Sequence, residues 1–471
     1  MVIQSKIRKI IFIVLIFLFE NEALAKDKIE LSFPENSYYV KSKSYSSNPE
    51  SEPPQYVHQL NKTKIESFKN VDWIDAGLAQ RIRFEHRKND YRRSINRTDN
   101  PFLLRTQAYF AVKNIFDPLR FTIEIQDSRR YRSEFTASVG DVNKLNLFQG
   151  YLELYFKNSF IQNREISLRA GRMAFEAMDR KLIARDDWGN SGTNFHGFRA
   201  IIGKKENDWQ LDNFVLNPIV KKTDDPDEVN KNQLIYGSIL HFRKFSHIAT
   251  LQPFFFKLTQ DQSSSASKRN INSPGLRFYG DVGDSGFDFD FIGIRQFGES
   301  DNKEFSAYAH ATEIGYNYQH KTKPRLSLVY GYASGDKNPY DNKSQNFERF
   351  YGFNRPWSNN NAIEWQNLET IKSRLELQPS TKVRFEGSYS YYWLASATDS
   401  WKRADLQDKT GRSSTFIGRD FDFRSHYEIT DNLRTTIGYA HFIPERFTKS
   451  VGRNQSSDFV YLEINLSLFG W

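Results

Sequence analysis

The sequence predicts an all-β fold: a transmembrane antiparallel β-barrel of about 18 strands, with short periplasmic turns and long extracellular loops. Three observations predict it. An export signal begins the chain, segments of alternating apolar and polar residues recur to its end, and the links between them alternate between short and long. Such strands have one face for hydrocarbon and one for water, and closure of the barrel pairs every strand edge.

Residues 1–25 are predicted to be a secretory signal peptide. Basic residues lie between positions 6 and 9, an apolar run covers 10–19, and Ala23-Leu24-Ala25 is a small-residue cleavage site. The mature chain would then begin near Lys26. A retained membrane anchor is the weaker alternative, because the apolar run is about half of the roughly 20 residues that a spanning helix needs.

Residues 26–70 are expected to form a flexible periplasmic segment before the barrel, which we assign to residues 71–471. Four prolines, Pro34, Pro49, Pro53 and Pro54, lie among Ser, Lys, Asn and Glu without a sustained hydrophobic period. A segment of this composition buries too little apolar surface to form a packed unit. The sequence leaves open whether it enters the lumen of the barrel.

The first barrel strand is expected at 77–87, because polarity alternates along it. Leu78, Ile82 and Phe84 share one face, whereas Arg81 and Arg83 lie on the other. The same alternation predicts seventeen further strands. They are 102–113, 118–129, 146–157, 164–174, 195–203, 207–217, 234–243, 247–258, 274–282, 286–297, 305–320, 324–334, 367–378, 381–394, 418–429, 432–443 and 457–469.

The lengths of the links give a second, independent signal. After every even-numbered strand the link is short, as at 114–117 and 204–206, and after most odd-numbered strands it is long, as at 175–194 and 335–366. The link 298–304 departs from this rule. Short periplasmic turns alternating with long outer loops are typical of an outer-membrane barrel, and an even strand count places both ends of the barrel in the periplasm. A soluble β-sandwich rarely has so many strands with such an asymmetry of links.

Composition and motifs argue against several other classes of protein. The chain has no cysteine, which excludes disulfides and thiolate metal sites, and its net charge of +9 is a sum over mixed signs rather than a basic tail. Together with the export signal, this argues against a nucleic-acid partner. The nine histidines are scattered, and no HExxH, GxSxG or phosphate-binding loop is present. We therefore expect no enzyme, no catalytic residue, no cofactor and no metal site. Asp336, Asp341 and nearby Asn residues could bind calcium at an outer loop, but we interpret this acidic turn as solvated.

Strand parity predicts a set of lumen arginines as the substrate path. An arginine on the lipid face would cost about 2–4 kcal/mol near the bilayer midplane, so these side chains are expected to point inward. The guanidinium fork pairs with carboxylates and stays charged at any pH of the envelope. The alternative is that carboxylates such as Glu85, Glu124, Glu153 and Asp127 neutralise them. The predicted lumen arginines are Arg81, Arg83, Arg105, Arg120, Arg169 and Arg199.

The stretch from Leu168 to Gly203 contains two predicted strands and a charged insert between them, which we interpret as a candidate constriction loop. Its candidate residues are Arg172, Arg180, Arg185, Asp186 and Asp187. The two aspartates could hold the loop arginines in place or act as a negative gate. Tyr109, Tyr151 and Tyr155 could stack on sugar rings or belong to the aromatic girdle at the membrane interface.

Several stretches resemble the alginate-export outer-membrane protein family. They are LRAGRMAF, DRKLIARDDWGNSGTNFHGFRAIIG, LSLVYGYASGDKNPYDNKSQNFERFYG (326–352) and QNLETIKSRLELQPSTKVRFEGSYSYYWLASATDSWKRAD (366–405). The resemblance covers most of residues 75–471 and departs from the family at Met173 and His196. It implies an eighteen-stranded monomeric barrel in the outer membrane of a Gram-negative bacterium, lined by arginines and passing an anionic polysaccharide outward.

Three functions follow as hypotheses. The first is an export channel for an anionic, alginate-like polysaccharide, with passive electrostatic selectivity, outer-membrane lipid and lipopolysaccharide around it and periplasmic export partners at its inner end. The second is a general or uptake porin for small anionic solutes. The third is an adhesin or receptor that acts through its long outer loops, chiefly 335–366 and 395–417.

Overall fold

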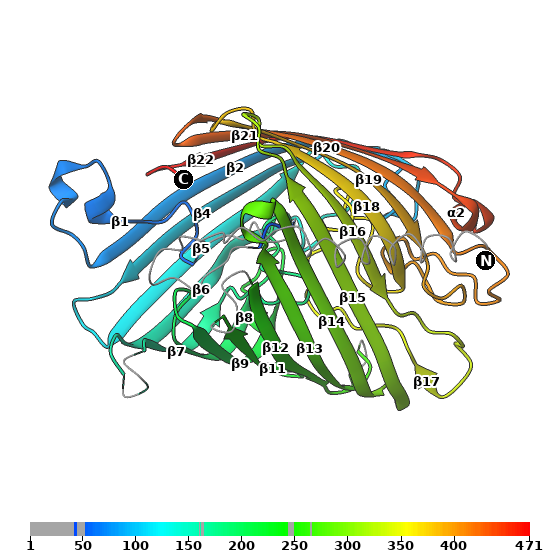
Figure 1. The fold of residues 1–471 in the computed structure, drawn as a ribbon, viewed down its shortest axis with the longest axis horizontal. Helices are drawn as coiled ribbons and strands as arrows, with labels where there is room; N and C mark the ends of the chain where they lie inside the picture. The colour runs from blue at the N-terminus through cyan, green and yellow to red at the C-terminus, as the bar shows by residue number, and fades with distance from the viewer. Residues whose placement is uncertain (1–41, 45–51, 160, 162–163, 244–248, 264–265) are drawn as a thin grey trace, which may run out of the picture. The chain divides into compact units, whose positions relative to one another are not determined.

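The structure, a computed structural model, describes residues 42–44, 52–159, 161, 164–243, 249–263 and 266–471. The predicted signal peptide lies outside these residues. In the described part of the chain one antiparallel sheet closes on itself, because β2 (Ile74–Lys88) pairs with both β4 (Phe102–Val112) and the last strand, β22 (Ser457–Ser467) (Figure 1). None of the helices described is long and apolar enough to cross a membrane.

The sheet has 22 strands in the described residues, and four of these are two residues long, which leaves eighteen strands in the barrel wall. All eighteen predicted strands are confirmed. The largest difference is at β13, which begins at Arg269 rather than at residue 274. The remaining wall strands are β5 (Leu119–Tyr131), β6 (Asn143–Phe156), β7 (Ile166–Met173), β8 (Phe195–Ile202), β9 (Trp209–Val220), β11 (Gln233–Phe242), β12 (Ala249–Gln260), β13 (Arg269–Asp281), β14 (Phe287–Ser300), β15 (Lys303–Asn317), β16 (Arg325–Ala333), β18 (Leu368–Leu377), β19 (Val383–Trp393), β20 (Phe416–Thr430) and β21 (Leu433–Pro444).

The links between the wall strands contain two-residue strands and short helices. The two-residue strands are β1 (His58–Gln59), β3 (Thr98–Asp99), β10 (Glu228–Val229) and β17 (Lys343–Ser344). The short helices are η3 (Leu60–Lys62), η4 (Glu66–Phe68), η5 (Gly283–Ser285), η6 (Lys402–Ala404) and α2 (Arg446–Ser450). The short links lie at one end of the barrel, which the sequence predicts to be the periplasmic end.

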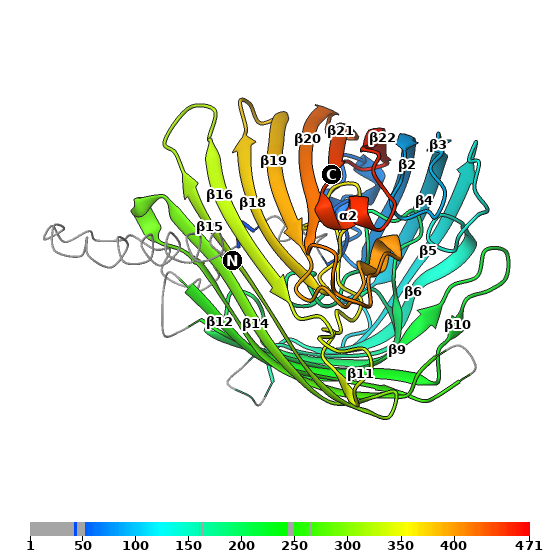
Figure 2. The same cartoon turned by 90° about the vertical axis from the view of Figure 1, so that its right-hand side faces the viewer.

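Alternate residues of each wall strand lie on opposite faces of the wall. On β2, Leu78 and Phe84 point outward and are exposed, whereas Arg81, Arg83 and Arg87 point inward and are buried. This follows from the period of two residues in a strand, which sends neighbouring side chains to opposite faces. In Figure 2, strands β4 to β6 face β16 to β19 across the interior, β9, β11, β12 and β14 lie below, and β20, β21, β22 and β2 join the two sides above.

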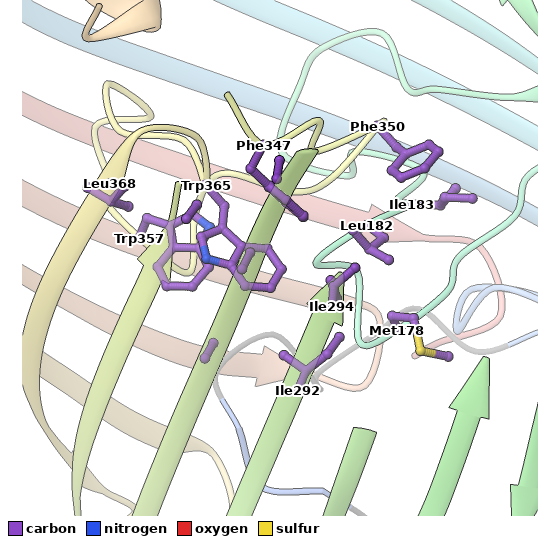
Figure 3. Packing of buried hydrophobic residues seen from close by; sticks show 14 of the residues in the cluster. Met178, Leu182, Ile183, Ile292, Ile294, Phe347, Phe350, Trp357, Trp365 and Leu368 are labelled. Atoms are coloured by element: carbon purple, nitrogen blue, oxygen red, sulfur yellow. The ribbon is translucent and has the colours of Figure 1, made fainter. Parts of the chain in front are cut away.

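Part of the inner face is apolar, which differs from the expected rule of apolar outside and polar inside. On β14, Ile292 and Ile294 point inward, and both side chains are buried. They belong to a cluster that also contains Leu182 from the β7–β8 link and Phe347 and Trp365 from the β16–β18 link (Figure 3). The apolar inner surface is therefore covered by outer loops that fold into the barrel, and those loops act as its core.

Described residues of the N-terminal segment, among them Glu52 and Tyr56, also contact the inside of the barrel. We expected residues 26–70 to lack regular structure, but their described part contains β1, η3 and η4, and β1 pairs with β2 at His58↔Ala76. The Tyr56 hydroxyl, which is buried, donates to Glu124 Oε1 at 2.8 Å. A Cβ at Gly77 would lie 2.5 Å from the Tyr56 carbonyl oxygen, so only glycine allows this close approach.

Candidate functional site

The β7–β8 link, residues 174–194, crosses the lumen. At one wall its Asp187 carbonyl oxygen accepts hydrogen bonds from Arg81 Nη1 at 2.6 Å and from Arg105 Nη1 at 2.9 Å. Arg83 Nη1 donates to the Trp188 carbonyl oxygen at 2.8 Å. These charge-assisted bonds to backbone oxygens fix the polar end of the loop against β2 and β4, since hydrogen bonds from charged donors are about twice as strong as neutral ones.

The other end of this loop packs against the apolar wall. Met178, Leu182 and Ile183 are buried in the same cluster as Ile292 and Ile294 of β14 (Figure 3). Apolar burial on one wall and arginine hydrogen bonds on the other hold the loop across the channel. The described loop therefore divides the interior rather than standing outside it.

The β16–β18 link adds a second inward-folded segment. Ile183 pairs with Tyr351 in a parallel bridge, the Tyr351 N–H donates to the Leu182 carbonyl at 2.9 Å, and the Phe353 N–H donates to the Arg180 carbonyl at 2.8 Å. The sequence interpretation placed 335–366 among the outer loops, but its residues 347–365 lie inside the barrel. The signal for this was its composition, because a solvated loop does not need so many aromatic residues.

Trp188 is enclosed by two arginines. The Arg83 guanidinium lies 3.9 Å from the centre of the indole ring, and the Arg355 guanidinium lies 3.6 Å from it. Tyr461 makes an edge contact with the same ring, with a distance of 4.8 Å between ring centres. The indole faces are thus occupied by cations, and the ring holds two like charges in place instead of presenting itself to a sugar.

Three of the predicted lumen arginines, Arg81, Arg83 and Arg105, meet at this loop. Two others, Arg169 and Arg199, face each other directly across β7 and β8, nearer the periplasmic end. The sixth, Arg120, lies apart from both groups. Its Nε pairs with Asp117 Oδ1 at 2.9 Å in the periplasmic turn, and its guanidinium lies 3.6 Å from the centre of the Tyr155 ring.

The candidate residues of the constriction loop make two kinds of contact: Asp187 contacts the loop arginines, and Asp186 contacts the backbone. Arg180 Nη1 donates to Asp187 Oδ2 at 3.0 Å, and Arg185 Nε lies 3.5 Å from Asp187 Oδ1. Asp187 thus contacts both loop arginines, whereas Asp186 accepts the backbone N–H of Gly189 at 3.2 Å. Of the two roles considered for these aspartates, this geometry matches that of holding the loop in place.

Arg172 does not join the loop. It shares the strand parity of Leu168, which points outward, and it donates to the Leu147 carbonyl at 3.0 Å and the Asp227 carbonyl at 3.1 Å. Our placement of Arg172 in the constriction loop is corrected accordingly: it binds β6 and the β9–β10 link near the extracellular rim of the wall.

Cavities lie on both sides of the crossing loops. A cavity of about 650 Å³ on the extracellular side is lined by Arg83, Arg87 and Trp188, among others. Two cavities of about 590 Å³ each lie on the periplasmic side. Trp188 and Phe353 line both the extracellular cavity and one periplasmic cavity, so this pair of side chains separates the two halves of the lumen.

Most lumen arginines have carboxylate partners. Arg83 Nε lies 2.8 Å from Glu85 Oε1, Arg169 Nε lies 3.0 Å from Glu153 Oε1, and Arg185 Nη2 lies 3.6 Å from Glu124 Oε1. The expected neutralising carboxylates Glu85, Glu124 and Glu153 therefore do contact arginines. Asp127 instead pairs with Arg129, which is half exposed.

Two guanidiniums at the crossing loops differ from the others. Arg105 donates to the carbonyls of Asp187 and Gly189, and Arg355 donates to the Asn359 carbonyl at 2.6 Å and the Tyr461 hydroxyl at 3.2 Å. In the described part of the chain neither forms an ion pair with a carboxylate. Their hydrogen-bonding capacity is largely used, but their positive charge is not neutralised by a direct partner.

The sequence interpretation overlooked further charged residues on the opposite wall. Applying the same parity rule to β16 through β20 would have found them, because each lies at a buried, inward position of its strand. Arg325 pairs with Asp288 at 2.6 Å, and Arg374 pairs with Glu313 at 2.8 Å. Arg355 and Glu52 had no such signal, since both lie outside any periodic segment.

No group of three or more His, Asp or Glu residues in the described ranges is arranged to hold a metal ion. The charged groups of the lumen instead form ion pairs and hydrogen bonds with one another.

The model of the alginate export family matches residues 72–461 of the chain. Among solved structures, OccK2 (OpdF) of Pseudomonas aeruginosa in complex with glucuronate has a TM-score of 0.59 at 11% identity, covering 84% of this chain and 98% of that one. OccAB2 of Acinetobacter baumannii has a TM-score of 0.57 at 12% identity, covering 84% and 97%. OccK8 (OprE) of Pseudomonas aeruginosa has a TM-score of 0.57 at 12% identity, covering 84% and 98%. At these identities the likeness concerns the fold. No curated protein matches the chain.

Proposed function

Because the chain belongs to the alginate export family and is an outer-membrane channel, we propose that it passes an anionic, alginate-like polysaccharide through its arginine-rich lumen. One observation carries this proposal. Arg83, Arg105 and Arg355 gather where the crossing loops separate the two halves of the lumen, and the last two have no carboxylate partner among the described residues. Positive charge that is not neutralised at a crossing point favours anions over cations.

The selectivity rests on few residues rather than on a continuous ladder. Arginines such as Arg169 and Arg185 are paired with carboxylates, so they contribute little net field to a passing ion. A polyuronate carries one carboxylate per sugar and would meet the excess charge one residue at a time. Weak successive contacts of this kind allow release as well as capture, which conduction requires.

A second candidate is a porin for small sugar acids. The observation that favours it is the division of the lumen into cavities of about 590 and 650 Å³, which suit a small solute without movement of the crossing loops. OccK2, which shares the fold, was solved with glucuronate, a sugar acid of this size. The adhesin hypothesis loses much of its basis, because residues 347–365 of its longest loop are folded inward.

The proposal is tested by reversal potentials in planar bilayers under a salt gradient. A unit charge about 7 Å from the ion path in water attracts an anion by about 0.6 kcal/mol and repels a cation by about as much, which together is a factor of about seven in the anion-to-cation permeability ratio. Arg105→Gln combined with Arg355→Gln should lower that ratio by about this factor per charge. Arg446→Gln, which changes an exposed arginine in α2 outside the lumen, is the matched control and should leave the ratio unchanged.

Block of the current separates the two candidates. If polyuronate interrupts the current at concentrations where glucuronate does not, the polymer channel is favoured. If glucuronate permeates and polyuronate has no effect, the small-anion porin is favoured. Cation selectivity of the unmodified protein would contradict both.

A further inference from the structure

The carboxylate of Glu52 bridges two wall arginines inside the barrel. Glu52 Oε2 lies 2.9 Å from Arg169 Nη1, and Glu52 Oε1 lies 2.9 Å from Arg199 Nη1. Arg169 and Arg199 are direct neighbours across β7 and β8, on the inward face. One carboxylate therefore uses both of its oxygens to join two guanidiniums that would otherwise repel each other.

Each of these arginines has its own wall carboxylate behind it. Arg169 Nε pairs with Glu153 Oε1 at 3.0 Å, and Arg199 Nη2 pairs with Asp212 Oδ2 at 2.8 Å. These partners fix the two guanidinium planes and leave one Nη1 of each directed into the lumen. Two preoriented donors of this kind fit a carboxylate, whatever molecule supplies it.

Glu52 does not belong to the wall. It lies in the N-terminal segment ahead of β1, 117 residues from Arg169 in sequence, and its side chain is 48% exposed. It lines a cavity of about 590 Å³ together with Arg169, Arg199 and the ring of Tyr151. The Arg169 guanidinium lies 5.3 Å from the centre of that ring, so the cavity joins a carboxylate site to an aromatic surface of the sort that sugars contact.

We propose that Arg169 and Arg199 form a carboxylate-binding subsite for a sugar acid, and that Glu52 occupies this subsite until a substrate carboxylate replaces it. The inference rests on the proposed function, because it takes the solute to be a uronate. The exchange leaves Arg169 and Arg199 paired with a carboxylate throughout. The cavity already reaches the Glu52 side chain, so the entering group need not first break the barrel wall.

The segment that carries Glu52 is held on both sides. Tyr56 is bonded to Glu124 at 2.8 Å, and Ser44 Oγ donates to Asp179 Oδ2 at 2.6 Å. Glu52 therefore stays near its arginines after leaving them and competes at a high effective concentration. If the subsite is free about a tenth of the time, the apparent affinity for an added carboxylate is about tenfold below its intrinsic value.

The test measures glucuronate binding to the full-length protein in detergent by titration calorimetry. Glu52→Gln keeps the shape of the side chain and removes its charge, so it should bind glucuronate about tenfold more tightly than the unmodified protein. Glu66→Gln, in the same N-terminal segment but exposed and paired with Lys69, is the matched control and should change nothing. Glucose, which lacks the carboxylate, should show no gain.

A second variant tests whether the negative charge at position 52 is what lowers the affinity for glucuronate. The chain has no cysteine, so Glu52→Cys is the single reactive thiol. A sulfonate-bearing methanethiosulfonate should return glucuronate affinity to that of the unmodified protein, whereas a neutral methanethiosulfonate should leave it at the higher value. Equal affinity in all these forms, or an equal gain for glucose, would overturn the inference.

The outcome is separable from that of the proposed function. An anion-selective channel whose glucuronate affinity does not respond to position 52 would refute the subsite and leave the channel proposal intact. A cation-selective channel would refute the channel proposal, and the calorimetric result would then stand as a property of the subsite alone.

Discussion

At the scale of single residues, the lumen contains two kinds of arginine. Arg169 and Arg199 are held by carboxylates, whereas Arg105 and Arg355 are held by backbone carbonyls and a hydroxyl. Pairing decides how much net field each contributes, since an adjacent carboxylate cancels most of a guanidinium's field at longer range. Counting arginines therefore overstates the positive charge of this lumen.

Trp188 is predicted to fix the charge at the crossing point. Each stacked guanidinium contributes about 1–2 kcal/mol of cation–π attraction when desolvated. Trp188→Ala should release Arg83 and Arg355, join the extracellular and periplasmic cavities and raise the single-channel conductance. Trp188→Phe keeps an aromatic ring and should stay close to the unmodified protein. Equal conductance in the alanine variant would show that Trp188 does not obstruct the path.

The Glu52 contact is predicted to be insensitive to pH within the range of the envelope. Partial desolvation inside the barrel would by itself raise the pKa of Glu52, whose side chain is half exposed, but Arg199 and Arg169 lower it far below its ordinary value of 4.5. The same two arginines also contact Glu153 on β6 and Asp212 on β9. A lowered folded-state pKa means that the stabilisation is complete above 4.5 and is lost only as the pH falls through that lower value.

The measurement for this prediction is the ratio of glucuronate affinities of Glu52→Gln and the unmodified protein at pH 8 and at pH 5.5. The two ratios should agree. A ratio that shrinks toward one at pH 5.5 would mean that Glu52 becomes protonated near its ordinary pKa, contrary to the bridged geometry.

At the scale of elements, two outer links form the core of the barrel. The β7–β8 link joins an apolar wall at Met178, Leu182 and Ile183 to a polar wall at Arg81 and Arg105. The inner face is apolar on one wall and rich in arginines on the other, and this difference positions the loop. Apolar burial holds one end of the loop, and hydrogen bonds from arginines hold the other end. The N-terminal segment adds a third inward element, through Tyr56 and Glu52.

The outward face of the strands gives a stability prediction. Val215 lies near the middle of β9, points outward and is exposed, so Val215→Lys should destabilise the folded barrel by about 2–4 kcal/mol in a bilayer. Leu119→Lys, at the first residue of β5 and also exposed, should cost only about 0–1 kcal/mol because it lies at the membrane interface. Urea unfolding in lipid vesicles measures both values. Equal costs would contradict the assigned depth of these strands.

At the scale of the whole molecule, the wall was predictable and the filling of the lumen was not. Period-2 alternation gave all eighteen strands, and parity placed Arg81 and Arg83 inward, because both are local properties of the chain. Contacts such as Ile183 with Tyr351, or Glu52 with Arg199, join segments that have no shared period and lie far apart in sequence. Only the folded structure brings them together.

The same distinction explains Arg172. Its position in the sequence is next to the charged insert, but its strand parity sends it outward with Leu168. Parity was the better guide, because β7 continues to Met173 before the loop begins. Composition is a weaker guide than strand parity, but it carries information. The aromatic residues of 347–365 indicate that this loop is buried.

The most direct test of the channel proposal is the reversal potential of single channels of the unmodified protein, measured in a planar bilayer under a potassium chloride gradient before and after polyuronate is added to the periplasmic side. The excess charge at Arg105 and Arg355 predicts an anion-selective reversal potential and interruptions of the current that lengthen with polymer concentration. A cation-selective reversal potential, with a current that polyuronate leaves unchanged, would contradict it.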